Sequence, residues 1–320
     1  MSEGKIKKSK KEIIKDIILL VVAAILIAFV SYWFFGSNCK YIKNGDGYKL
    51  IKYFDEKGVT ELNIDYVNGD KDKPVNAVSS HAFGNNKYLK TINISDSVKE
   101  IDKTTFSGCS SLERIIVDEN NTSYCDDEGV LYDKEQTILI CYPANRYVYL
   151  MDKHGYTEKD EVKSNTSNFW SNVYTYIIPD TVVTIGEESF AGAKIATVIM
   201  TYNLKTIEDR AFYKCTFLDE IISNGENSKS NYFLPVSLEY IGAEAFRYCE
   251  KLGYIYIPSK VTYIGTCAFR DTGTNVEKDE EYVFINVALS KEEFENKVEA
   301  GKKWYRGNGE NINYGVGEQN

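Results

Sequence analysis

The sequence is poor in the residues that most often carry catalysis at neutral pH. Only two histidines occur among 320 residues, His81 and His154, and neither has a cysteine, an aspartate or a second histidine at metal-ligand spacing. We also find no glycine-rich phosphate loop, no G-x-S-x-G elbow and no kinase signature. We therefore predict no metal site and no cofactor, and we rank an enzyme below two binding roles.

Charge is absent from one long stretch near the N-terminus. Residues 17–35, "IILLVVAAILIAFVSYWFF", follow a segment with six lysines and end in aromatic residues. Nineteen helical residues at about 1.5 Å each span roughly 28 Å, close to the thickness of a bilayer core. The pattern predicts a single transmembrane helix over 17–35, a basic cytoplasmic tail over 1–16, and a remainder outside the membrane.

Two other interpretations of this segment stay open. A cleaved signal peptide has a shorter apolar region that ends in small residues, whereas this one ends in bulky aromatics. A lipid-modified Cys39 is the second alternative, although Asn38 stands where a small residue is expected.

Basic residues are in deficit beyond the membrane segment. The whole chain carries a formal charge of −9 and its N-terminal tail is positive, which leaves about −12 on residues 36–320. Nucleic acid phosphates would be repelled by such a domain, so we predict no nucleic-acid partner.

A repeat dominates the rest of the chain. An apolar residue stands five positions before a phenylalanine at six places, and neighbouring copies within each half are often 22 or 23 residues apart, which predicts a solenoid. The six pairs are Val78/Phe83, Ile101/Phe106, Ile185/Phe190, Ile207/Phe212, Ile241/Phe246 and Ile264/Phe269.

Alternating Ile-x-Ile segments follow the repeat phenylalanines. Pro179, Pro235 and Pro258 come directly after apolar residues of this kind, and proline ends a strand and turns the chain. One repeat alone cannot bury its apolar residues, so we expect the units to stack as a wall of short parallel strands.

The unit "IGAEAFRYCEKLGYIYIPSKVTYIG" resembles the BspA-type leucine-rich repeat of bacterial cell-surface proteins. The resemblance implies a leucine-rich repeat solenoid with initial strands over 47–64, an inserted β-hairpin within 117–143, and a closing strand and capping helix within 282–305. Ser290 and Glu293 independently form a capping box for that helix.

These observations divide the chain into successive segments. We predict a linker over 36–46, a solenoid over 47–305 and a mobile tail over 306–320. Insertions interrupt the solenoid near 118–172 and 223–233, and such loops protrude from one face.

The positions of the seven cysteines follow the repeat and do not indicate redox or metal chemistry. Cys109, Cys215 and Cys249 each lie three residues after a repeat phenylalanine, and Cys267 lies two before another. We predict that they are buried as small hydrophobic residues. A disulfide between Cys215 and Cys249 is also compatible with the spacing of adjacent coils.

One strand position forms a candidate partner-binding face. If the strands alternate regularly, residues about ten positions past each phenylalanine point away from the core, and a stack of them would make an apolar stripe. This count selects Asn93, Ile116, Ile199, Ile222 and Tyr256, and the matching strand before Ile178 adds Ile177. The competing interpretation is that β-branched residues simply suit strands, or that an insertion covers the stripe.

The functional hypothesis is a membrane-anchored, extracytoplasmic protein at the cell surface that binds a protein or glycan without catalysis. This adhesion or host-contact role is what the family resemblance implies. The alternative is an envelope scaffold or sensory subunit that docks another membrane or surface protein of the same cell. Under either hypothesis the chain meets the membrane through 17–35, and no small-molecule substrate is expected.

Overall fold

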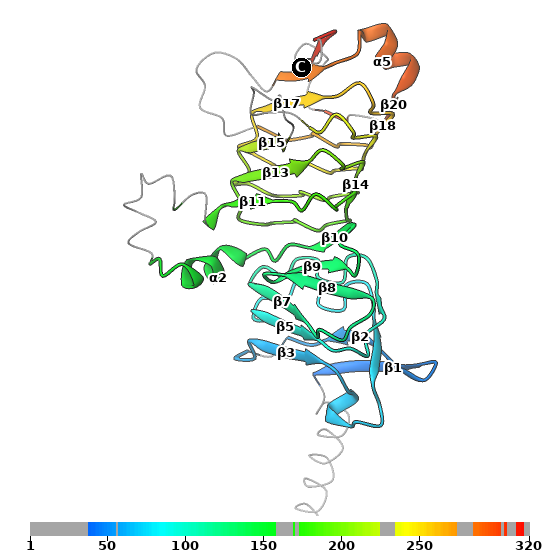
Figure 1. The fold of residues 1–320 in the computed structure, drawn as a ribbon, viewed down its shortest axis with the longest axis vertical. Helices are drawn as coiled ribbons and strands as arrows, with labels where there is room; N and C mark the ends of the chain where they lie inside the picture. Colours follow the sequence, from blue (N-terminus) through cyan, green and yellow to red (C-terminus); the bar gives the residue numbers. More distant parts are fainter. Residues whose placement is uncertain are drawn as a thin grey trace, which may run out of the picture.

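Stacked coils give the described part of the chain the form of a solenoid (Figure 1). The computed structural model describes residues 38–55, 57–157, 169, 173–224, 234–273, 284–301, 304–305 and 312–316. Within these ranges, no helix is both long enough and apolar enough to cross a bilayer. The predicted membrane segment 17–35 and the tail 1–16 lie outside the described residues.

One side of the solenoid, here called the long-strand face, consists of strands of three to five residues in three parallel sheets. The sheets are β3 (Glu61–Ile64), β5 (Thr91–Ile94) and β7 (Arg114–Val117); β11 (Thr175–Ile177), β13 (Thr197–Thr201) and β15 (Glu220–Asn224); and β17 (Tyr254–Ile257), β19 (Phe284–Val287) and β21 (Ile312–Tyr314).

A second side, the short-strand face, contains a four-stranded and an eight-stranded sheet. The first is β1 (Cys39–Asn44), β2 (Gly47–Tyr53), β4 (Val75–Val78) and β6 (Glu100–Ile101). The second, in spatial order, is β20 (Glu299–Ala300), β18 (Tyr263–Ile264), β16 (Tyr240–Ile241), β14 (Thr206–Ile207), β12 (Thr184–Ile185), β10 (Ile138–Cys141), β9 (Val130–Asp133) and β8 (Tyr124–Asp127).

The repeat phenylalanines form the centre of the core. Phe190, Phe212, Phe246 and Phe269 stack in succession, with ring centroids 4.7, 5.1 and 5.2 Å apart. Each ring is almost wholly buried, so each coil hides its aromatic ring against the next. This arrangement explains the repeat, because a ring at the same height in every coil meets a partner on both sides.

The glycine of the repeated Ile-Gly pair allows the coils to approach closely. A Cβ atom on Gly242 would lie 2.4 Å from the backbone nitrogen of Asp209, and one on Gly265 would lie 2.2 Å from that of Ala243. Any side chain at these positions would push neighbouring coils apart. The Gly242 amide also donates to the carbonyl oxygen of Ile207 over 2.8 Å.

The inserted hairpin β8–β9 separates two hydrophobic cores. Leu131 of β9 packs into the N-terminal core, whereas its neighbours Val130 and Tyr132 pack into the C-terminal core. All three side chains are fully buried. Strand alternation therefore lets a single strand serve both cores, and helix α2 (Arg146–Lys153) leaves the stack just beyond this junction (Figure 1).

Both ends of the solenoid differ from the sequence-based segment boundaries. Residues 36–46 were expected to be a linker, but β1 pairs antiparallel with β2 and covers the first coil. Residues 306–320 were expected to be a mobile tail, but β21 pairs with β19, and Tyr314 packs against Phe294. Both segments contain alternating apolar residues that can pair with an exposed sheet edge.

The capping helix forms as predicted. Helix α5 (Lys291–Lys297) begins at Ser290, whose side chain accepts from the Glu293 amide while the Glu293 carboxylate accepts from the Ser290 amide. Phe294 faces inward and contacts Trp304, whose ring meets that of Phe269 at the end of the aromatic stack. The helix thus closes the core at the last coil.

The column of cysteines caps carbonyl groups inside the core. The thiols of Cys215 and Cys249 donate to the carbonyl oxygens of Phe190 and Phe212, over 2.9 and 3.1 Å. Thr272 occupies the same position in a later coil, and its hydroxyl donates to Phe246 in the same way. Cys215 and Cys249 are therefore reduced thiols that donate hydrogen bonds, and no disulfide joins them.

Removal of one ring from the stack should destabilise the solenoid. We expect Phe212→Ala to lower the free energy of unfolding by about 3–5 kcal/mol, because the cavity removes ring contacts on both sides. Phe217→Ala, at a ring that is 45% exposed, should change it by less than about 1 kcal/mol. Urea titration followed by circular dichroism measures both values, and equal losses would contradict the stacking argument.

The buried thiols should resist modification in the folded protein. Burial raises the pKa of both Cys109 and Cys215 to about 12, so almost no reactive thiolate exists at pH 8. With a thiol-specific alkylating reagent and mass spectrometry, we expect the half-buried Cys125 to be labelled well before these two. Fast labelling of Cys215, or recovery of a peptide pair joined through Cys215 and Cys249, would contradict this assignment.

Candidate binding surfaces

The six predicted surface residues occur in ladders on the long-strand face. Ile177, Ile199 and Ile222 stand opposite one another across β11, β13 and β15. Asn93 stands opposite Ile116 across β5 and β7, and Tyr256 of β17 belongs to the third sheet. The six positions therefore form a structural column that is divided among three separate sheets.

The middle ladder is the most apolar part of this column. Ile177 is 62% exposed, and Ile199 and Ile222 are half-buried beside it. Ile116 in the preceding sheet is 39% exposed. Adjacent parallel strands lie about 4.8 Å apart, so the three isoleucines of the middle ladder form a continuous, rigidly spaced surface.

The N-terminal part of the column is polar. The Asn93 side-chain amide donates to Asn63 over 2.6 Å and to Glu61 over 2.7 Å. Its hydrogen-bonding groups are thus engaged within the protein's own sheet. A corresponding pair, Asn286 and Asn313, lies on the third sheet, with a donor–acceptor distance of 3.1 Å.

Tyr256 does not belong to an exposed stripe. The residue is only 3% exposed, and its hydroxyl donates to the carbonyl oxygen of Val316 over 3.0 Å. The returning C-terminal segment that includes β21 provides this partner. The expectation of an exposed Tyr256 was wrong because it treated this segment as a mobile tail. The alternation of Ile312, Tyr314 and Val316 was the signal that would have predicted cover.

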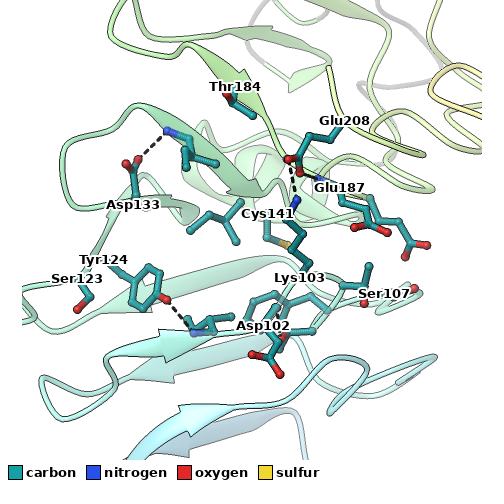
Figure 2. Close-up of a pocket in the computed structure, with 18 of the residues that line it drawn as sticks. Asp102, Lys103, Ser107, Ser123, Tyr124, Asp133, Cys141, Thr184, Glu187 and Glu208 are labelled. Atoms are coloured by element: carbon teal, nitrogen blue, oxygen red, sulfur yellow. Dashed lines mark hydrogen bonds and ion pairs between the residues drawn. The ribbon is translucent and has the colours of Figure 1, made fainter. Parts of the chain in front are cut away.

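A second candidate surface is a cleft in the short-strand face, which sequence reasoning did not find (Figure 2). It has a volume of about 390 Å³. Its walls come from the turn after β6, from the hairpin region β8–β10, and from the residues after β12 and β14. Segments widely separated in sequence therefore meet at the place where the inserted hairpin interrupts the stack.

The cleft exists because one step of the short-strand sheet is missing. In stacked coils, the carbonyl oxygen of the short-strand isoleucine accepts a hydrogen bond from a backbone amide of the following coil. The Ile185 oxygen accepts from the Glu208 amide over 2.9 Å, and the Ile207 oxygen accepts from the Gly242 amide over 2.8 Å. Among the described residues, β6 pairs with β4 alone, and no such bond reaches the carbonyl oxygen of Ile101. Its amide instead donates to the hydroxyl of Tyr124 over 2.7 Å.

The floor of the cleft is apolar. Ile138 and Ile140 of β10 line it, together with Ile101 and Phe106. Ile138 is 40% exposed, and Phe106 is more exposed than the phenylalanines of the C-terminal stack. The interruption therefore uncovers side chains that a regular coil would bury.

The rim of the cleft is charged and crosses the junction. Lys103, from the turn after β6, pairs with Glu208 of the C-terminal half over 2.7 Å (Figure 2). The second carboxylate oxygen of Glu208 accepts from the Glu187 amide over 2.9 Å. This ion pair ties the two halves together across the opening, and five carboxylates in the lining face two lysines.

Glu187 is the least compensated acid of the rim. Partial burial raises the pKa of its carboxyl group, and the neighbouring Asp209, Glu188 and Glu208 raise it further, against the opposing effect of Lys103. Asp102 and Glu188, in contrast, have ion-pair partners in Lys49 and Arg210. The acidic pair in "IGEESF" was a sequence signal for this rim, but nothing in the residue pattern placed it near Lys103.

Neither histidine belongs to these surfaces. His81 shares a hydrogen bond with Thr104 over 3.1 Å, and His154 ends helix α2. Among the described residues, no group of three or more histidine, cysteine or acidic side chains is arranged to hold a metal ion.

Three solved structures are among those to which the chain is similar. The pneumococcal vaccine antigen PcpA is 18% identical, with coverage of 82% of this chain and 69% of that chain and a TM-score of 0.47. A leucine-rich repeat protein from Eubacterium ventriosum is 16% identical, with coverages of 83% and 82% and a TM-score of 0.47. One from Bacteroides ovatus is 18% identical, with coverages of 84% and 67% and a TM-score of 0.43.

Comparison by sequence gives a negative and a positive result. No curated protein matches the chain. The family described as "BspA type Leucine rich repeat region" matches in six copies, over residues 29–128, 161–278 and 223–300. These matches cover well over half of the chain, and the stacked coils have the architecture that such repeats build, so the protein belongs to the BspA-type leucine-rich repeat family.

Proposed function

We propose that this protein is anchored in the membrane by residues 17–35 and holds its solenoid outside the cell, where it binds a protein or glycan without catalysis. The observation that carries the proposal is the partly exposed isoleucine ladder of β11, β13 and β15. An apolar row on a rigid sheet is a surface that gains free energy when a partner covers it.

The surroundings of the ladder support a binding role. Polar side chains stand beside it in the same strands, with Thr175, Thr197 and Glu220 aligned in register. An apolar centre with a polar margin is the usual composition of a protein interface. The backbone hydrogen bonds between strands hold the side chains in place, so little conformational entropy remains to be lost on binding.

The second candidate is an envelope scaffold or sensory subunit of the same cell. The lysine-rich residues 1–16 and the apolar residues 17–35 favour it, because a chain held in the membrane is positioned to meet membrane neighbours. The two candidates differ in where the partner is found, either outside the cell or among the cell's own envelope proteins.

The anchor makes a direct prediction about location. The full chain should remain in the membrane pellet after carbonate extraction, and protease added to intact cells should digest its solenoid. A variant that lacks residues 2–37 should leave the membrane. Recovery of a shortened chain that begins near residue 36, as shown by intact mass, would indicate a cleaved signal peptide and contradict the anchor.

The isoleucine ladder makes a prediction about binding. We expect the triple variant Ile177→Ser, Ile199→Ser and Ile222→Ser to weaken binding to a panel of matrix proteins and glycans by at least about tenfold, because apolar contact area is lost. Binding of each panel member to the full chain is measured by biolayer interferometry. Binding only to the producer's own envelope proteins would favour the scaffold candidate.

The control changes three exposed apolar side chains elsewhere. Ile42→Ser, Phe54→Ser and Val236→Ser alter residues that lie outside the middle sheet. This control should retain binding, and both triple variants should keep the circular dichroism spectrum of the parent. Equal loss of binding in both would contradict the ladder as the contact surface.

A further inference from the structure

We propose that the cleft in the short-strand face is a second binding site, which takes an extended peptide segment of a partner protein that carries a lysine or arginine next to an apolar residue. The peptide would lie along β6 as an added strand. This site is separate from the isoleucine ladder and does not depend on the function proposed for it.

The open strand edge is the first reason for this occupant. Ile101 lines the cleft, and among the described residues its carbonyl oxygen receives no backbone hydrogen bond from a following coil. In each neighbouring coil, a backbone amide fills the equivalent place. An extended peptide supplies a backbone amide of this kind, as peptides do when they add to a sheet edge.

The side chain of Tyr124 occupies the place of the strand that would pair with β6 in a regular coil. It stands 23 residues after Ile101, where the regular period would place the next short strand, yet only its hydroxyl reaches the Ile101 amide. β8 instead pairs with β9 in the hairpin. The side chain of a tyrosine thus bridges a space that a backbone occupies in the other coils.

The floor of the cleft suits apolar side chains. Ile138, Ile140 and Phe106 line it, and the exposed fraction of Ile138 shows that the floor is open to solvent. Successive side chains of an added strand point to opposite faces. An apolar side chain of the peptide would therefore cover the floor while its neighbours face outward.

Charge selects a cationic peptide over an anionic one. Lys103 is paired with Glu208, and Asp102 with Lys49, whereas Glu187 at the rim forms no ion pair within the described part of the chain. A second recess shares Lys103, Glu187 and Glu208 with this rim and adds Asp209 to its lining. A lysine or arginine side chain that leaves the cleft toward Glu187 would meet a half-buried carboxylate, which is a favourable pairing.

The test uses the purified full chain and a labelled seven-residue peptide of alternating valine and lysine, followed by fluorescence anisotropy. We expect a dissociation constant of about 10–100 μM, as is typical of short unconstrained segments. A peptide with glutamate in place of lysine should not bind. A peptide with N-methyl groups on alternate backbone amides should bind about tenfold more weakly, because it lacks the donors for Ile101.

Two variants of the cleft should weaken binding without unfolding the chain. Glu187→Gln removes the carboxylate charge at similar size and should reduce affinity about five- to tenfold. Ile138→Arg places a cation on the exposed floor and should reduce it by at least as much. Glu119→Gln, at an exposed position away from the cleft, is the matched control and should leave affinity unchanged.

Four results would overturn the proposal. They are absence of binding by the valine–lysine peptide at millimolar concentration, equal binding of the glutamate peptide, equal binding of the N-methylated peptide, and unchanged affinity in both cleft variants. The triple serine variant of the isoleucine ladder should bind the peptide normally. Failure of the cleft is thereby distinguished from failure of the ladder.

Discussion

The contact between one coil and the next is the constraint on which the rest of this structure depends. Rings of the repeat phenylalanines stack at about 5 Å, which is also the distance between hydrogen-bonded strands, so the aromatic stack and the backbone sheets share one spacing. Gly242 and Gly265 permit this approach because no side chain fits between the coils. Each coil is stable only with a neighbour, so the ends and any interruption need special cover.

The inserted hairpin shows what an interruption requires. Its strand β9 sends Leu131 into one core and Val130 and Tyr132 into the other, so both cores stay closed on their inner sides. In the described part of the short-strand face no strand extends β6, the carbonyl of Ile101 accepts no backbone hydrogen bond, and the side chain of Ile138 is exposed in the cleft. The inserted hairpin thus explains both the separation of the two hydrophobic cores and the cleft in the short-strand face.

Local and periodic features were predictable from the sequence, whereas covering contacts between distant segments were not. The phenylalanine column, the short strands and the Ser290–Glu293 capping box each follow from spacings within a single unit. β1 and β21 were missed because a strand that pairs with an exposed edge needs only a few alternating residues and no repeat. The same omission led to the wrong expectation for Tyr256, since its cover comes from a segment about 60 residues later.

The two faces of the solenoid offer different chemistry. The regular repeat determines which side chains line the long-strand face, whereas the interruption of the repeat determines which side chains line the cleft in the short-strand face. On the long-strand face, every coil contributes the same position, so Ile177, Ile199 and Ile222 form a uniform apolar row suited to a broad partner. On the short-strand face, the cleft gathers residues from both halves, and Lys103 and Glu208 connect its rims. A repeated surface offers a partner a large contact area made of similar side chains. The interruption of the repeat instead brings together a combination of side chains that the regular coils do not provide. For this reason, specificity for a short segment is more readily built at the break than along the ladder.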